Sequence, residues 1–229
     1  RMWNAEIIDG VGVKMSRVSV DGEEGYPANL SVSVTYSLSD DNALCLKYEA
    51  NADGDTLCSL TNHAYFNLDG DFKTVLGHEV FIDSDYLTTV DDELIPHGEK
   101  RNIVGTAFDF KAPKTIGKDI NADEHMLKIA RGYDFNYVLN GEGFRKVATA
   151  KGEKSGIKMS VYTDRPCMQF YTGNFLSGLQ GKRVYGYQSA FCMETQGYPN
   201  AQNVPSFESV KLEKGKTYSA VTEYKFDVE

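Results

Sequence analysis

A two-residue alternation between apolar and small polar side chains recurs along this chain, and it is clearest over residues 30–38. There leucine, valine and Tyr36 alternate with serine and threonine, the pattern of a half-buried antiparallel strand. Residues 146–150 and 156–162 are predicted to form a hairpin, because Gly152 and Gly156 bracket a turn between them. A second hairpin is predicted from residues 209–212 and 218–226, turning near Gly215. Further strands are predicted at residues 44–49, 79–82, 168–172 and 190–196.

Helical spacing is restricted to residues 120–130. Ile120, Leu127 and Ala130 share one side of such a helix, with Met126 at its margin, and Gly132 provides the stop. The chain of 229 residues shows no internal repeat, low-complexity tract or interdomain linker. We therefore expect residues 1–229 to form a single all-β domain, a large antiparallel β-sandwich with a short helix near 120–130.

Composition excludes several classes of partner. The net charge of −9 disfavours nucleic acid and anionic membranes as partners. No apolar run approaches the length of a membrane span, and the hydrophobic share is 41%. The four cysteines and four histidines show no metal-ligand spacing, so neither structural zinc nor a disulfide scaffold is expected. Reduced thiols in a cytoplasmic protein are the simplest interpretation.

Residues 61–68 (TNHAYFNL) are the first stretch that indicates chemistry. Read as a strand, they place Thr61, His63, Tyr65 and Asn67 on one face, while the opposite face is largely apolar. Such a face is typical of a strand that lines a cleft for a polar ligand. The alternative is that His63 is a structural histidine whose hydrogen bonds are satisfied within the fold.

The second such stretch is residues 189–196, where Glu194 lies inside an otherwise apolar strand. Burial without a neighbouring cation raises the pKa of a carboxyl group and brings it toward the range of a general base. The alternative is an edge-strand glutamate that points to solvent. Gln169 is a third polar group in an apolar strand, and Asp134 follows the predicted helix stop, where aspartate is commonly a turn former.

In combination these segments resemble the aldose 1-epimerase (galactose mutarotase) family. The resemblance rests on DGEEGYP at 21–27, TNHAYFNL at 61–68, GYD at 132–134, QFYTGN at 169–174 and FCMETQ at 191–196. It runs in register from Trp3 to the C-terminus, so it covers the whole chain. Each piece alone would be weak, but the combination is highly specific.

The resemblance implies an antiparallel β-sandwich that interconverts the α and β anomers of a free hexose, galactose or glucose, through the open-chain aldehyde. By position, Glu194 matches the family's general base and His63 its general acid. Two such groups suit this chemistry because their environments can separate their pKa values. Asp134 and Gln169 match positions that bind sugar hydroxyls. The family implies no cofactor and no metal, and a small free aldose as the partner.

The chain also departs from the family pattern. Family members begin with an N-terminal portion that supplies an Asn-Arg pair and another histidine, and Arg1 is not a translation start. We therefore expect an N-terminally truncated domain that is inactive by itself, stabilised by self-association or by the missing N-terminal segment bound as a separate chain. Phe135 stands where the family often has histidine, which puts one polar contact in doubt. His78, His97 and His125 are expected at the surface, and the acidic run 91–93 in a solvated loop.

Two other functions stay open at this point. A hexose-phosphate mutarotase of the same fold should gather arginines at the mouth of its site, yet Arg131, Arg165 and Arg183 are dispersed in the sequence. A non-catalytic carbohydrate-binding β-sandwich is the other alternative, because one fold hosts many functions.

Overall fold

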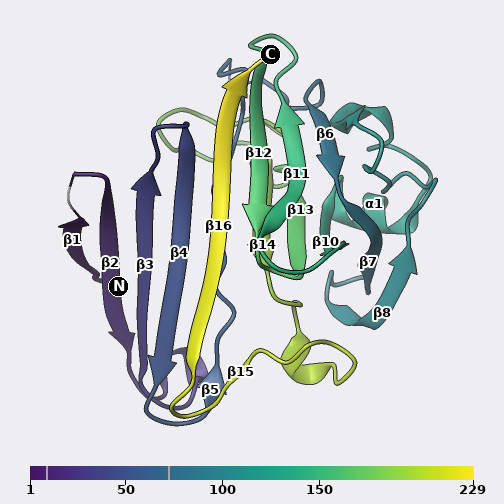
Figure 1. Cartoon of the computed structure of the whole chain (residues 1–229). Helices are drawn as coiled ribbons and strands as arrows, with labels where there is room; N and C mark the ends of the chain where they lie inside the picture. The colour runs from purple at the N-terminus through teal and green to yellow at the C-terminus, as the bar shows by residue number, and fades with distance from the viewer. Residues whose placement is uncertain (9, 72) are drawn as a thin grey trace.

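Two stacked antiparallel sheets make up the computed structural model, which describes residues 1–8, 10–71 and 73–229 (Figure 1). Within these residues the larger sheet has nine strands and the second sheet has five. A two-stranded sheet joins β5 (Thr56–Leu57) to β15 (Lys211–Leu212). The prediction of a large antiparallel β-sandwich is therefore confirmed.

The strand order places sequence-distant segments side by side. The larger sheet runs β1 (Asn4–Ile8), β2 (Gly12–Ser19), β3 (Leu30–Leu38), β4 (Ala43–Ala52), β16 (Thr217–Val228), β12 (Ile157–Thr163), β11 (Arg145–Lys151), β6 (Glu79–Ile82) and β9 (Lys114–Thr115). The second sheet runs β14 (Cys192–Gln196), β13 (Cys167–Tyr171), β10 (Asp134–Leu139), β7 (Ser84–Val90) and β8 (Pro96–Asn102). In the view of Figure 1, β13 and β14 lie behind the larger sheet.

Local sequence accounts well for the regular strands. The alternating stretch 30–38 forms β3 over the predicted residues. The hairpin of β11 and β12 also forms, and the backbone N–H of Gly152 donates to Ile157 O at 2.9 Å across its turn. Gly156 has a φ of +68°, which a glycine adopts without strain. Both predictions are confirmed.

The second predicted hairpin, from residues 209–212 and 218–226, is wrong. β15 pairs with β5, whereas β16 pairs with β4 on one edge and β12 on the other. A strand has only two hydrogen-bonding edges, so β16 has none left for β15. Both segments are strands as predicted, but long-range pairing decides their partners.

The helix α1 (His125–Ala130) is shorter than the predicted 120–130. The residues before it form turns instead, with Ala122 N–H donating to Asp119 O at 3.0 Å. Arg131 takes a left-handed conformation after the last turn, and Gly132 N–H donates to Leu127 O at 3.0 Å to close the helix. Three short 3₁₀ helices complete the elements: η1 (Glu23–Gly25), η2 (Ile116–Lys118) and η3 (Ala201–Asn203). No helix in the described part of the chain has the length and apolar character needed to cross a bilayer.

The main core fills the space between the two sheets. The second sheet contributes buried side chains from the inner faces of β10, β13 and β14, and the larger sheet contributes others from β4, β12 and β16: Phe135, Tyr137, Phe170, Met193, Leu46, Tyr48, Val161 and Tyr224. Since side chains alternate along a strand, the opposite face of β10, β13 and β14 is available for polar residues.

Candidate active site

The face of the second sheet that points away from the core carries two rows of side chains across three strands. Strand register places these residues directly opposite one another on β10, β13 and β14. The rows are Asn136–Gln169–Glu194 and Asp134–Tyr171–Cys192. Because each row member is two residues from its neighbour in the other row, all six share one face.

Amide side chains make hydrogen bonds across this face of the sheet. Gln169 Nε2 donates to Asp134 Oδ1 at 2.7 Å, and Gln196 Nε2 donates to Asn136 Oδ1 at 3.0 Å. Asn136 Nδ2 is buried and has no hydrogen-bond partner within the described residues. A buried donor of this kind is costly unless something else accepts its hydrogen bond.

Glu194 lies in this face with its side chain only 9% exposed. Burial, and secondly the negative charge of Asp134, raise the pKa of Glu194 to about 7 from its ordinary value of 4.5. Burial also raises the pKa of Asp134, opposed by the hydrogen bond from Gln169 and by His63. β14 is an edge strand of its sheet, but the alternative that Glu194 points to solvent is wrong.

His63 reaches Glu194 from a segment outside the sheet. The predicted strand over residues 61–68 is wrong as regular structure, because the strand-type pairing of these residues is limited to an isolated bridge between Phe66 and Phe191. The alternation nevertheless survives, since Thr61, His63 and Tyr65 are exposed and their neighbours less so. His63 Nε2 lies 3.5 Å from Glu194 Oε1, and the His63 ring stacks on Tyr65 at 4.9 Å.

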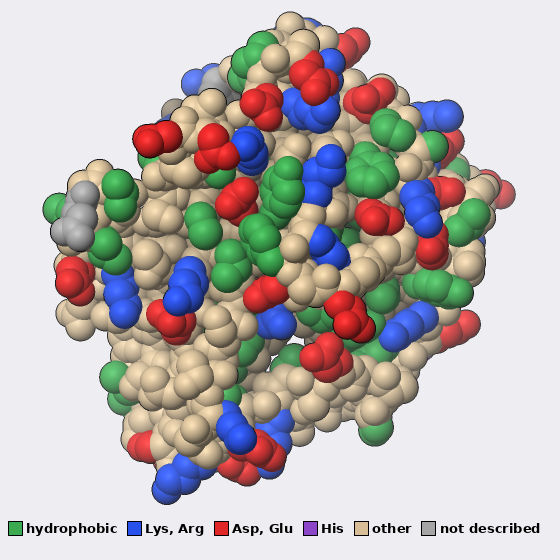
Figure 2. Space-filling model, viewed as in Figure 1, with side chains coloured by type: hydrophobic (Ala, Val, Ile, Leu, Met, Phe, Trp, Pro, Cys, Tyr) green, Lys and Arg blue, Asp and Glu red, His purple; other side chains and the backbone are tan. Residues whose placement is uncertain are grey.

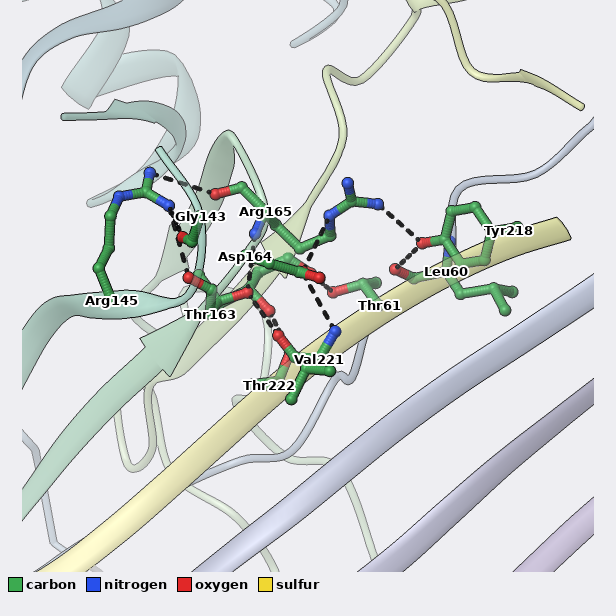
Figure 3. A network of polar contacts seen from close by, with 11 residues as sticks. Leu60, Thr61, Gly143, Arg145, Thr163, Asp164, Arg165, Tyr218, Val221 and Thr222 are labelled. Carbon is green, nitrogen blue, oxygen red and sulfur yellow. Dashed lines mark hydrogen bonds and ion pairs between the residues drawn. The ribbon is translucent and has the colours of Figure 1, made fainter. Parts of the chain in front are cut away.

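Side-chain hydrogen bonds hold this segment where a strand ladder would otherwise do so (Figure 3). Tyr218 Oη, on β16, accepts from Leu60 N–H at 3.2 Å and from Arg165 at 3.3 Å. Thr61 Oγ1 donates at 2.9 Å to the carbonyl of Thr195, the residue after Glu194. Together with the Phe66 bridge, these contacts fix both ends of the segment around His63.

A cleft of about 290 Å³ is lined by the side chains of Glu194, His63, Asp134 and Gln169. Its walls are formed by His63, Thr88, Val90, Leu94, Pro96, Asp134, Asn136, Gln169, Glu194, Gln196 and Pro199. A larger cavity of about 650 Å³ lies beside Trp3, Arg17 and Tyr198, away from the acidic pair. We place the site in the smaller cleft because the carboxyl groups with raised pKa converge there.

The structure brings together all four residues that sequence reasoning selected: Glu194, His63, Asp134 and Gln169. Sequence reasoning missed Asn136 and Gln196, which the two-residue period counted from Asp134 and Glu194 could have found. It also missed Thr88, whose buried hydroxyl has no hydrogen-bond partner among the described residues. No local pattern marks Thr88.

Several secondary expectations are also decided. Phe135 points into the core, so it takes no part in this face. The surface prediction for His78 is wrong: it is 1% exposed, and its Nε2 accepts from Leu68 N–H at 3.0 Å. His97 and His125 are exposed as predicted, as is the acidic run 91–93. His78 is buried, unlike the other two histidines, because the chain entering β6 places its ring against Phe191 in the core.

Arginines do not gather at this cleft. Of the candidates, Arg131 lies over the ring of Phe175 at 5.8 Å, and Arg165 binds Tyr218. Among the described residues that line the cleft, none is lysine or arginine. The cleft is therefore acidic and polar.

Comparison with known proteins gives a consistent result. The family model for aldose 1-epimerase matches residues 1–225. Galactose mutarotase from Homo sapiens is 44% identical over 232 residues, and the match covers 99% of this chain and 66% of that protein. Aldose 1-epimerase from Escherichia coli (strain K12) is 36% identical over 235 residues, covering 100% of this chain and 68% of that protein. The chain thus spans about two thirds of the length of these relatives.

Solved structures agree with the sequence matches. A crystal structure of an aldose epimerase homologue from C. elegans superposes with a TM-score of 0.90 at 29% identity, covering 100% of this chain and 69% of that one. Galactose 1-epimerase from Lactobacillus acidophilus superposes with a TM-score of 0.89 at 26% identity, covering 100% of this chain and 67% of that one.

Proposed function

The chain belongs to the aldose 1-epimerase family, and on that premise we propose that it is an isomerase interconverting the α and β anomers of free aldoses such as galactose and glucose. The observation that carries the proposal is the buried carboxyl group of Glu194, with a pKa of about 7, lying 3.5 Å from His63 Nε2. A group that titrates near working pH can accept a proton in one half of a reaction and return it in the other.

The proposed reaction opens and recloses the sugar ring. Glu194 removes the proton from the hydroxyl on C1 while His63, as imidazolium, protonates the ring oxygen. The bond between C1 and the ring oxygen breaks, and C1 becomes an aldehyde. The C1–C2 bond then rotates, and the hydroxyl formed from the ring oxygen attacks the other face of the aldehyde. His63 takes its proton back from this hydroxyl, and Glu194 returns a proton to the oxygen on C1.

The spacing of the pair suits this reaction. The two oxygens that exchange protons are both bonded to C1, so the acid and the base must have their reacting atoms close together. His63 Nε2 and Glu194 Oε1 are 3.5 Å apart, which is close enough for both to reach oxygens on the same carbon. The exposed ring of His63 gives it room to turn toward a sugar that enters the cleft.

We propose that Asp134 and Gln169 bind sugar hydroxyls. Their mutual hydrogen bond of 2.7 Å leaves one carboxylate oxygen of Asp134 and the amide oxygen of Gln169 to face a ligand. Asn136 Nδ2 and Thr88 Oγ1 lack partners among the described residues and line the same cleft, which supports a polar ligand there.

Two further assignments go with this proposal. We propose that residues 1–229 act as one domain, because a single cluster of core residues joins both sheets. We also propose a cytoplasmic location, which is supported by the free thiols of all four cysteines.

The proposal is tested by following the optical rotation of freshly dissolved α-galactose with and without the protein, supplied with the N-terminal portion that family members carry, in the absence of any added cofactor. Glu194→Gln keeps the shape of the side chain but removes the base, so we expect turnover to fall by about 10²–10⁴-fold with little change in sugar affinity. Glu99→Gln, at an exposed position on β8, is the matched control.

Two outcomes would decide against the proposal. With that N-terminal portion present, rotation that changes no faster than in buffer would remove the isomerase interpretation and leave a carbohydrate-binding β-sandwich. Turnover in Glu194→Gln equal to that of Glu99→Gln would remove Glu194 as the base. His63→Asn is expected to lower turnover in parallel, through loss of the acid.

A further inference from the structure

Three different donor side chains meet at the acid–base pair. A ring nitrogen of His63, Cys192 Sγ and a carboxylate oxygen of Glu194 all lie within 4.8 Å of one another. Within the residues that the structure describes, this is the one group of three or more such side chains with that spacing. The reaction proposed above uses only two of the three.

The third member, Cys192, comes from the strand that carries Glu194. Cys192 and Glu194 are two positions apart on β14, so both side chains lie on one face, and His63 contacts both. His63 Nδ1 lies 3.4 Å from Cys192 Sγ, and His63 Nε2 lies 3.5 Å from Glu194 Oε1. The spacing of cysteine and histidine along the sequence gives no sign of this, because 129 positions separate His63 from Cys192.

One thiol, one imidazole and one carboxylate form a donor set that suits zinc. Bond lengths of about 2.0–2.3 Å and tetrahedral angles place the ligand atoms about 3.3–3.6 Å apart. His63 makes contacts of that length through two different nitrogens, Nδ1 toward Cys192 and Nε2 toward Glu194, so binding one ion through a single nitrogen requires a turn of the His63 ring. That ring is 53% exposed, so it has room to move. Hard cations such as Mg²⁺ prefer all-oxygen sites and fit this set poorly.

From this geometry we propose that a borderline-soft divalent cation of the zinc class binds to His63, Cys192 and Glu194 and reversibly blocks the active site. Three protein ligands leave one coordination position for water. The ion occupies the nitrogen and the oxygen that otherwise exchange protons with the substrate. The blocking role rests on the proposed function, whereas the binding itself does not.

Two properties follow from the ligands. Cation and sugar exclude each other, because both need His63 and Glu194. Binding also releases protons, since the thiol and the carboxyl group must both give up theirs, so affinity rises with pH.

The test uses Cd²⁺ as a spectroscopic probe and Zn²⁺ as its competitor. A cadmium–thiolate bond gives a charge-transfer absorption in the ultraviolet, so binding is measured without any assay of turnover. We expect one equivalent of Cd²⁺ to produce this band, Zn²⁺ to displace it, and Mg²⁺ to have no effect. Added galactose is expected to weaken Cd²⁺ binding.

Variants assign the ligands. Cys192→Ser is expected to abolish the band, and His63→Asn to weaken binding by at least about a hundredfold, since loss of an outer partner alone costs about 10–100-fold. His63→Asn changes a half-exposed side chain, so it keeps the test decisive if Cys192→Ser does not fold. Cys45→Ser is the matched control, because Cys45 also lies opposite a carboxylate, Glu223, on the neighbouring strand.

The inference is overturned if no thiolate band forms, if the band persists in Cys192→Ser, or if His63→Asn binds Cd²⁺ as tightly as the unaltered chain. A protein that accelerates mutarotation but gives no band would contradict this inference and leave the proposed function intact. A protein that gives the band but does not accelerate mutarotation, even with the N-terminal portion present, would support the binding site and contradict the proposed function.

Discussion

At the scale of single residues, the burial that suits Glu194 to the role proposed for it also has a cost in stability. Burial and the neighbouring Asp134 raise its pKa to about 7 from 4.5. A folded-state pKa above the unfolded one means that the folded protein binds more protons between these values. Stability is therefore greatest below about pH 4.5 with respect to this group and declines as pH rises toward 7.

Removing this charge should stabilise the fold at high pH. We expect Glu194→Gln to raise the free energy of unfolding at about pH 8 by about 1–3 kcal/mol, since about 1.36 kcal/mol accompanies each unit of pKa shift. At about pH 4.5, where Glu194 is mostly protonated in the folded state, the difference should nearly vanish. Urea unfolding at both pH values measures this, with Glu99→Gln as the control. A variant less stable than the parent at the higher pH would contradict the origin assigned to the shift.

His78 should give the opposite dependence on pH. Burial lowers its pKa from 6.5, so the folded protein keeps it neutral while the unfolded chain takes up a proton. Stability is fully present above about 6.5 and is lost as pH falls through the folded pKa. We expect His78→Gln to reduce the loss of stability between about pH 6.5 and 5. His97→Gln, at an exposed site, is the matched control, and an equal effect of both variants would argue against His78 as the source.

At the scale of elements, the segment around His63 depends on side chains rather than on a strand ladder. Tyr218 and Thr61 bind its N-terminal end, and the bridge of Phe66 to Phe191 binds its C-terminal end. Such a segment can place a catalytic group above a sheet without belonging to it. The position of His63, however, depends on the few hydrogen bonds that hold this segment.

Tyr218→Phe tests this dependence, because it deletes one hydroxyl that accepts from both Leu60 and Arg165. We expect the free energy of unfolding to fall by about 1–2 kcal/mol, and kcat/KM to fall by about tenfold through misplacement of His63. Denaturant unfolding and polarimetry measure the two effects.

Tyr48→Phe is the control for this variant. Its hydroxyl is buried and has no hydrogen-bond partner in the described part of the chain, so its removal should leave stability unchanged or slightly higher. If Tyr218→Phe behaves like Tyr48→Phe in both measurements, the network of Figure 3 does not position His63.

At the scale of the whole molecule, charge bears on the choice of substrate. The chain carries a net charge of −9, and on the face shown in Figure 2 its acidic and basic side chains are interspersed. The cleft itself is lined by Glu194 and Asp134, with neither lysine nor arginine among its described lining residues. An anionic substrate would therefore meet repulsion, whereas a neutral sugar would not.

Phosphorylated and free sugars should be distinguished accordingly. We expect kcat/KM for glucose 6-phosphate to be at least about tenfold lower than for glucose at low ionic strength, and the gap to narrow as added salt screens the charges. The rate with glucose should be nearly independent of salt. A preference for the phosphorylated sugar would favour the hexose-phosphate alternative.

Short stretches of the sequence suffice to predict the character of the strands and to select Glu194 and His63, which the structure places 3.5 Å apart. Alternation with a period of two is a property of the extended backbone, so β3 and the β11–β12 hairpin could be predicted from short windows. The same period marks Asp134 and Asn136 as one polar face. A carboxyl group within an apolar strand already indicates burial, and with it a raised pKa, as found for Glu194.

Which distant segments meet depends instead on the folded molecule as a whole. β16 takes β4 and β12 as neighbours instead of β15, His78 is enclosed by the core, and Cys192 comes within 3.4 Å of His63 across 129 positions. These outcomes depend on how each strand edge finds a partner and on which faces are enclosed when the sheets stack. Strand pairing and the enclosed faces are both determined only when the whole chain folds. No short stretch of sequence is therefore sufficient to predict them.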